Sequence, residues 1–229
     1  SIGEAKVEYG NPIIEVKIDK EAKKLHIIDQ GLGMTADEVE KYINQIAFSG
    51  AEEFLEKYKD SAKDSGVIGH FGLGFYSAFM VASKVEIITK SYKDEPAAHW
   101  TCDGSPEFSL VPHNKTDRGS EIILHISEDS LEFLEEYKIS ELLTKYNKFM
   151  PIPIKFGTKQ EALPKPEDAP EDYKTEYQEI DNIINNPNPA WTKQPVDLTD
   201  EDYKKFYHEL YPMQFEEPLF NIHLNVDYP

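Results

Sequence analysis

The sequence has little cysteine and arginine, and it has no long apolar run. Cys102 is the single cysteine, which excludes an internal disulfide framework and any multi-cysteine metal site. Arg118 is the only arginine, so chemistry that needs a planar guanidinium has one candidate. No apolar run approaches the roughly 20 residues that a membrane-spanning helix needs. These absences favour a soluble protein of a reducing compartment, and we expect a cytoplasmic location.

Acidic residues greatly outnumber basic ones. The 229 residues include 43 Asp and Glu against 24 Lys and Arg, a net charge of −19. Nucleic acids and anionic membranes both attract clustered positive charge, so neither is an expected partner. Hydrophobic residues make up 39% of the chain, which is enough for the core of one or two domains and argues against wholesale disorder.

Hydrophobic periodicity predicts an α+β fold. Alternating apolar residues predict a β-hairpin over 14–28, and the capping box of Thr35 and Glu38 predicts a helix that begins after Met34. Further strand patterns cover 85–89, 99–102, 108–111 and 121–126, while helical patterns cover 75–81, as a buried helix, and 131–149. Strands and helices do not alternate one by one along the chain. This order favours a two-layer sandwich, in which an antiparallel or mixed sheet is covered by helices on one face.

Composition changes near residue 157 and divides the chain. Residues 157–176 contain three prolines among acidic residues and read as a linker or exposed loop. We therefore expect a first domain over 1–156, a possible last strand of it over 177–184, and the start of a truncated second domain over 185–229. In that second part we expect Thr199 to cap a helix and Trp191 to anchor the first turn in the core. The alternative role for Trp191 is an aromatic side chain that binds another protein.

The first of two glycine-rich stretches follows the predicted hairpin. In Ile27–Met34 a strand delivers Asp29 into a turn with Gly31 and Gly33. A carboxylate there can accept a hydrogen bond from an exocyclic amine, and glycine lets a ring approach the backbone closely. An ordinary strand-to-helix turn with an Asx-type aspartate explains the same residues.

The second stretch, Gly69–Gly74, precedes the predicted helix over 75–81. Backbone N–H groups at a helix N-terminus, exposed by glycine, can bind phosphate. The order Gly-x-x-Gly-x-Gly differs from that of dinucleotide folds, and the Gly-Lys-Ser/Thr of the Walker loop is absent. A glycine hinge that packs a helix tightly is the alternative.

Taken together, the two stretches identify a resemblance. The chain resembles bacterial members of the heat-shock protein 90 chaperone family, within the ATPase superfamily of type II topoisomerases, histidine kinases and mismatch-repair proteins. The matching stretches are IIDQGLGMT, IAFSG, VIGHFGLGFYSAFMVA, DRGSEIILHI and AWTKQPVDLTDEDYKKFY. The last resembles the start of the chaperone's middle domain and favours the chaperone over a kinase or topoisomerase. The resemblance implies a Bergerat-type ATPase domain that lacks its first strand and helix.

The resemblance also implies a nucleotide site. Asp29 would receive the adenine amine, Gly33 and Met34 would line the base pocket, and Ser120 would stand in place of the family's usual threonine. The phosphates would be wrapped by Gly69, His70, Phe71, Gly72, Leu73 and Gly74, followed by Phe75. Residues 44–69 would form a lid, with Phe48 where relatives commonly carry a lysine.

By the same resemblance, the parent protein is an ATP-dependent chaperone of the stress response. ATP would close the lid and drive dimerisation of the nucleotide domains. These changes would be coupled to the remodelling of unfolded or partly folded client proteins. The family's E-x-x-x-N-x-x-D motif holds the catalytic Glu and the Mg²⁺-binding Asn, and we expect it upstream of residue 1. We therefore expect no catalytic residue, no metal ligand and no ATP hydrolysis in these residues alone. A non-enzymatic interaction module remains the alternative of another class.

Overall fold

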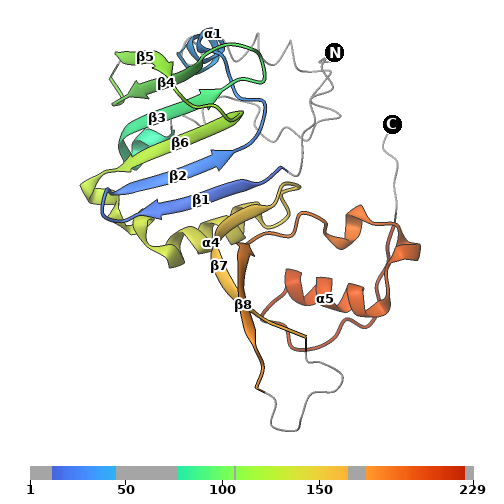
Figure 1. The fold of residues 1–229 in the computed structure, drawn as a ribbon. Helices are drawn as coiled ribbons and strands as arrows, with labels where there is room; N and C mark the ends of the chain where they lie inside the picture. Colours follow the sequence, from blue (N-terminus) through green and yellow to red (C-terminus); the bar gives the residue numbers. More distant parts are fainter. Residues whose placement is uncertain (1–11, 45–76, 106, 165–173, 225–229) are drawn as a thin grey trace.

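The computed structural model describes residues 12–44, 77–105, 107–164 and 174–224. These residues form an eight-stranded sheet in the order β5-β4-β3-β6-β2-β1-β7-β8 (Figure 1). The strands are β1 (Ile14–Asp19), β2 (Lys24–Asp29), β3 (Ala82–Lys90), β4 (Ala97–Cys102), β5 (Phe108–His113), β6 (Gly119–Ile126), β7 (Ile154–Ala162) and β8 (Tyr177–Ile183). The strands β1 and β7 pair in parallel, and the other described pairs are antiparallel. The sheet is therefore mixed.

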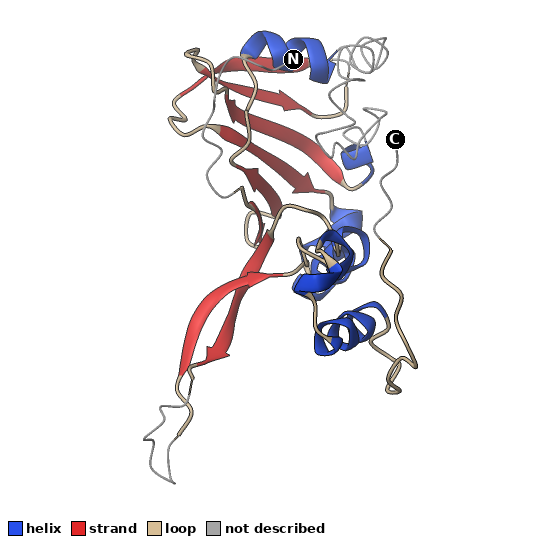
Figure 2. Cartoon of the chain, turned by 90° about the vertical axis from the view of Figure 1, so that its right-hand side faces the viewer, coloured by secondary structure: helices blue, strands red, loops and turns tan. Residues whose placement is uncertain are grey.

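The described helices lie on one side of this sheet (Figure 2). They are α1 (Ala36–Val39), continued by the π-helical turn η1 (Glu40–Asn44), the 3₁₀ turns η2 (Ser77–Met80), η3 (Glu128–Leu134), η4 (Ala190–Thr192) and η5 (Pro195–Asp197), and the helices α4 (Glu136–Asn147) and α5 (Asp200–Leu210). The capping boxes at Thr35 and Thr199 are both formed. This arrangement confirms the predicted α+β class.

Strand alternation places the core between the sheet and the helices. In β3, Val85 and Ile87 are 0% and 1% exposed, and Trp100 of the neighbouring strand β4 pairs with Ile87. Because successive side chains of a strand point to opposite faces, Glu86 and Ile88 lie on the face that the helices leave open. Cys102 is buried in β4, as expected.

Two expectations about regular structure were wrong. The part of 75–81 that the structure describes is the short 3₁₀ turn η2, and its Met80 is 81% exposed instead of buried. The predicted linker begins too early, because 157–162 belong to strand β7. These residues pair with β8, which confirms the predicted strand over 177–184, and the two strands project together as a hairpin (Figure 1).

The C-terminal segment packs against the end of α4 through aromatic rings. Trp191 meets Phe149 at a centroid distance of 4.6 Å and Phe206 of α5 at 5.4 Å. Trp191 itself is 50% exposed, so it covers this cluster from outside and is not the core anchor that the sequence suggested. The division into two domains at 185 stays a prediction.

Candidate functional site

The turn between β2 and α1 carries Asp29. The Asp29 Oδ1 atom accepts the N–H of Gly31 at 2.7 Å, so the Asx-type turn is formed. Among the described residues none donates to the second oxygen, Oδ2, and the side chain is partly exposed. The local fold thus uses one carboxylate oxygen and leaves the other as an acceptor.

Gly33 lets this turn lie directly on the end of β3. Its φ is +61°, and a Cβ placed on it would lie 1.9 Å from the carbonyl oxygen of Lys90. Any side chain would collide with that backbone atom. The position therefore requires glycine both for its positive φ and for this close approach. The N–H of Tyr92 donates to the carbonyl of Leu32 at 2.8 Å and fastens the same contact.

Ser120 enters the site from β6. The strands β2 and β6 pair with Ile28 opposite Glu121, so Asp29 and Ser120 lie side by side at one end of the sheet. Ser120 is 8% exposed, and its Oγ lies 3.0 Å from Oγ1 of Thr89. The site therefore gathers residues from two strands that are neighbours in space.

Thr89 joins these parts, although sequence reasoning did not select it. Its side chain is fully buried, and its Oγ1 accepts the N–H of Met34 at 2.9 Å in addition to the contact with Ser120. The one signal in the sequence is a threonine on the apolar face of β3, after Val85 and Ile87. Asp29, Gly33, Met34 and Ser120 are thus brought together around the end of β3.

The phosphate half of the predicted site, Gly69, His70, Phe71, Gly72, Leu73, Gly74 and Phe75, lies outside the described residues. The same holds for Phe48 and for all but the first residue of the predicted lid, 44–69. The phosphate half of the nucleotide site therefore stays a prediction.

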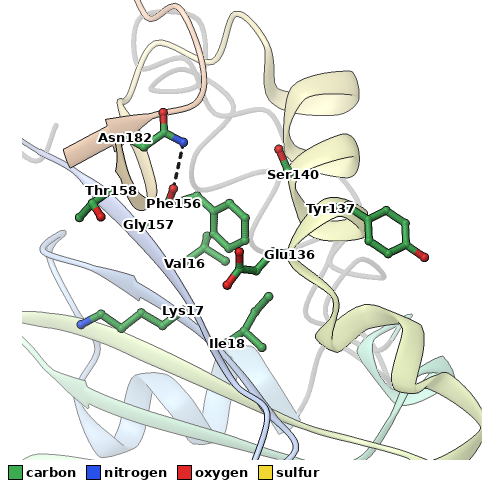
Figure 3. Close-up of a pocket in the computed structure, with 10 residues that line it drawn as sticks. All are labelled: Val16, Lys17, Ile18, Glu136, Tyr137, Ser140, Phe156, Gly157, Thr158 and Asn182. Carbon is green, nitrogen blue, oxygen red and sulfur yellow. Dashed lines mark hydrogen bonds between the residues drawn. The ribbon is translucent and has the colours of Figure 1, made fainter. Parts of the chain in front are cut away.

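A separate cavity of about 720 Å³ lies between β1, α4 and the β7–β8 hairpin (Figure 3). Val16, Ile18 and Phe156 give it apolar walls, and Glu136 and Ser140 of α4 add polar groups. None of Asp29, Gly33, Met34 and Ser120 lines it, so this cavity is distinct from the predicted site.

Two negative findings apply to the described part of the chain. Its His, Cys, Asp and Glu side chains form no group of three or more that could hold a metal ion. None of its helices has the length and apolarity that a membrane crossing requires.

Comparison with known proteins places this geometry in a family. The sequence model of the histidine kinase-, DNA gyrase B- and HSP90-like ATPases matches residues 5–126, which include the whole turn and Ser120. The chain belongs to this ATPase family. A second model, of the Hsp90 protein, matches residues 162–228. Both matches confirm the resemblance found in the sequence, and the eight-stranded sheet agrees with the Bergerat-type fold that it implied.

Bacterial chaperones are close relatives within this ATPase family. The chain is 60% identical to chaperone protein HtpG of Bacteroides thetaiotaomicron and 56% identical to that of Porphyromonas gingivalis, in both cases over its whole length. It is 40% identical to HtpG of Bacillus subtilis over 93% of its length. The chain spans only 32% to 34% of the length of these relatives.

Proposed function

We propose that the chain is part of an ATP-binding molecular chaperone of the HtpG type and forms the adenine side of its nucleotide site. The observation that carries this proposal is that Met34 and Ser120 both contact the buried hydroxyl of Thr89, while Gly33 packs on the Lys90 backbone and Asp29 lies beside Ser120. The match of residues 162–228 to the Hsp90 model disfavours the histidine kinase and topoisomerase alternatives.

Each residue has a proposed role that its surroundings permit. Asp29 Oδ2 accepts the adenine amine, while Oδ1 keeps the turn closed through Gly31. Gly33 and Met34 line the base, and the Ser120 hydroxyl hydrogen-bonds near it. Gly69–Gly74 and Phe75 bind the phosphates, since glycine exposes the backbone N–H groups that an anion needs.

The activities of the whole protein are proposals as well. We propose that residues 44–69 form a lid that closes when ATP binds. Lid closure drives dimerisation and couples ATP hydrolysis to the remodelling of client proteins in the cytoplasm. A closed state is stabilised only by the contacts that nucleotide makes in it and not in the open state. We assign no Mg²⁺ ligand to the described residues and propose that Mg²⁺ binds through residues mostly outside this chain.

Calorimetric titration with an ATP-competitive adenine mimic tests the base site. The sample is a protein of the relatives' length that carries this chain, compared with its Asp29→Asn variant. Asparagine still accepts the Gly31 N–H, so the turn survives, but its amide replaces an acceptor with a donor opposite the adenine amine. We expect a loss of affinity of about 10- to 100-fold, the range for a hydrogen bond to a charged group.

The matched control is Asp37→Asn, an exposed carboxylate in the first turn of α1. This variant should bind like the wild type. Wild-type binding no stronger than that of Asp29→Asn would overturn the proposal. We also propose that the 229 residues alone bind ATP weakly and do not hydrolyse it, and micromolar, Mg²⁺-dependent binding by them would contradict this.

A further inference from the structure

Thr89 occupies an unusual position for a hydroxyl group. It ends the apolar face of β3 and is 0% exposed, so it cannot touch a ligand from solvent. Val85 and Ile87 precede it on the same face, and valine would satisfy the strand equally well in shape and propensity. Burying a hydroxyl costs free energy unless it is hydrogen-bonded, so its bonds are the reason to look for a role.

The hydroxyl makes two contacts, one to each side of the candidate site. The Met34 N–H donates to Oγ1 at 2.9 Å, which fixes the backbone at the end of the Asp29 turn. The Ser120 Oγ lies 3.0 Å from the same atom. A hydroxyl has one proton and two lone pairs, so Thr89 can accept from Met34 and still share a hydrogen bond with Ser120.

We infer that Thr89 is a positioning residue that fixes the Met34 backbone and the Ser120 hydroxyl relative to each other, and thereby sets the selectivity of the site for adenine. This inference rests on the proposed function. Thr89 acts through its two partners and does not itself contact the nucleotide. Its loss should therefore change which base is preferred, and not merely whether the protein folds.

Two substitutions separate the hydroxyl from the shape of the side chain. Thr89→Val keeps the branched shape and removes both hydrogen bonds, whereas Thr89→Ser keeps the hydroxyl and removes a methyl group. Both are made in the protein of the relatives' length, and the dissociation constants of ADP and of inosine diphosphate, which lacks the exocyclic amine, are measured. Thr89→Val should raise the dissociation constant of ADP about tenfold, as expected for one or two lost hydrogen bonds. It should also reduce the preference for ADP over inosine diphosphate. Thr89→Ser should stay within about twofold of wild type.

The coupling between Thr89 and Ser120 gives a second measurement. Ser120→Ala should weaken ADP binding by itself. The double variant with Thr89→Val should lose less binding free energy than the sum of the two single losses, because both substitutions break the same contact. Simple additivity would contradict the inferred link.

A third measurement does not depend on nucleotide. Hydrogen exchange at the Met34 amide of the unliganded protein should become faster in Thr89→Val and stay slow in Thr89→Ser, since only the first loses the acceptor. Unchanged exchange in Thr89→Val would overturn the inference.

The outcomes distinguish this inference from the function beneath it. If the wild type does not bind ADP, the proposed function fails. If the wild type binds ADP and Thr89→Val has the same ratio of ADP to inosine diphosphate affinity, the inference alone fails. A lowered unfolding midpoint with an unchanged ratio counts against it in the same way, because that is the result of a purely structural role.

Discussion

Gly119 and Asp29 are in direct backbone contact, although they lie on different strands. A Cβ on Gly119 would lie 2.1 Å from the carbonyl oxygen of Asp29, a separation that real Cβ atoms do not tolerate. Gly119 also has a φ of +116°, which side chains disfavour. The start of β6 can therefore approach the end of β2 only because residue 119 is glycine, and this approach places Ser120 beside Asp29.

Gly119→Ala should consequently damage both the fold and the site. The added methyl group must push the Asp29 backbone away, so we expect a loss of unfolding free energy above the roughly 1–2 kcal/mol that backbone strain alone costs. Urea unfolding measures the loss, and titration with the adenine mimic should show weaker binding in the folded fraction.

Gly157→Ala is the matched control for that experiment. Gly157 has a φ of +69°, but a Cβ on it would meet no atom within 4 Å. This variant should lose about 1 kcal/mol from backbone strain and keep its affinity for the mimic. If both variants lost the same unfolding free energy and the same affinity, the contact of Gly119 with Asp29 would be unimportant.

Much of the sheet could be predicted, because its evidence is local. The alternating apolar residues over 14–18, the apolar strand pattern over 121–126 and the capping box at Thr35 depend on neighbouring residues alone. The second half of β7 could not be predicted, since 157–162 are polar and exposed and become a strand only by pairing with β8. The mostly apolar residues over 75–81 show no clear period, so they could not reveal that Met80 is exposed.

The candidate site divides in the same way. Asp29 and Gly33 could be selected because a strand end, an aspartate and glycines are adjacent in the chain. Ser120 was selected from the family resemblance. Thr89 was missed because its role depends on the register of β3 with β6, where it pairs with Ser120, and a single sequence does not contain that register.

Asn185 joins the end of β8 to the turn between α4 and β7. Its side chain donates to the carbonyls of Met150 and Ile152 at 2.8 and 2.9 Å, and its Oδ1 accepts the N–H of Ile154 at 2.7 Å. Asn185 is 8% exposed, so water cannot easily replace it. Asn185→Ala should cost about 2–4 kcal/mol, because one buried and two partly buried backbone groups lose their partner.

Urea unfolding of the same protein checks this value. Asn188→Ala is the control, since Asn188 is exposed and only its backbone N–H is hydrogen-bonded, to Asn186 Oδ1. The control should change the unfolding free energy by less than about 0.5 kcal/mol. A similar result for Asn185→Ala would show that its three hydrogen bonds contribute little.

Trp191 fastens α5 to the end of α4 through its ring contacts with Phe149 and Phe206. Phe149 and Phe206 also contact each other at a centroid distance of 5.9 Å, and Asn186 donates a hydrogen bond to the Glu209 carboxylate at 3.0 Å. Trp191→Ala should therefore loosen α5 without unfolding the sheet. Hydrogen exchange should become faster over 200–210 and stay unchanged in β3 and β6, whereas Val196→Ala, at a side chain 90% exposed, should change neither. Faster exchange throughout the sheet would contradict this separation.

Glu86 lies on the face of the sheet away from the helices, and it makes the stability of the protein depend on pH. It is 9% exposed, and its carboxylate contacts His99 of β4 at 2.6 Å, Lys84 of β3 at 3.2 Å and His125 of β6. Burial opposes ionisation of Glu86, but the hydrogen bonds from His125, His99 and Lys84 outweigh it and lower its pKa from 4.5 to about 2.

Since the pKa of Glu86 is lower in the folded state, its contribution to stability is complete above pH 4.5 and is lost as the pH falls towards 2. The shift corresponds to at most about 3 kcal/mol. Glu86→Gln keeps the shape and removes this titration, so the wild type should lose up to about 3 kcal/mol more than the variant between pH 4.5 and 2. Unfolding free energies of both proteins, measured by urea titration across this range, give the difference directly. Parallel pH profiles would mean that Glu86 titrates alike in the folded and unfolded chains, and that the two histidines and Lys84 do not stabilise its charge.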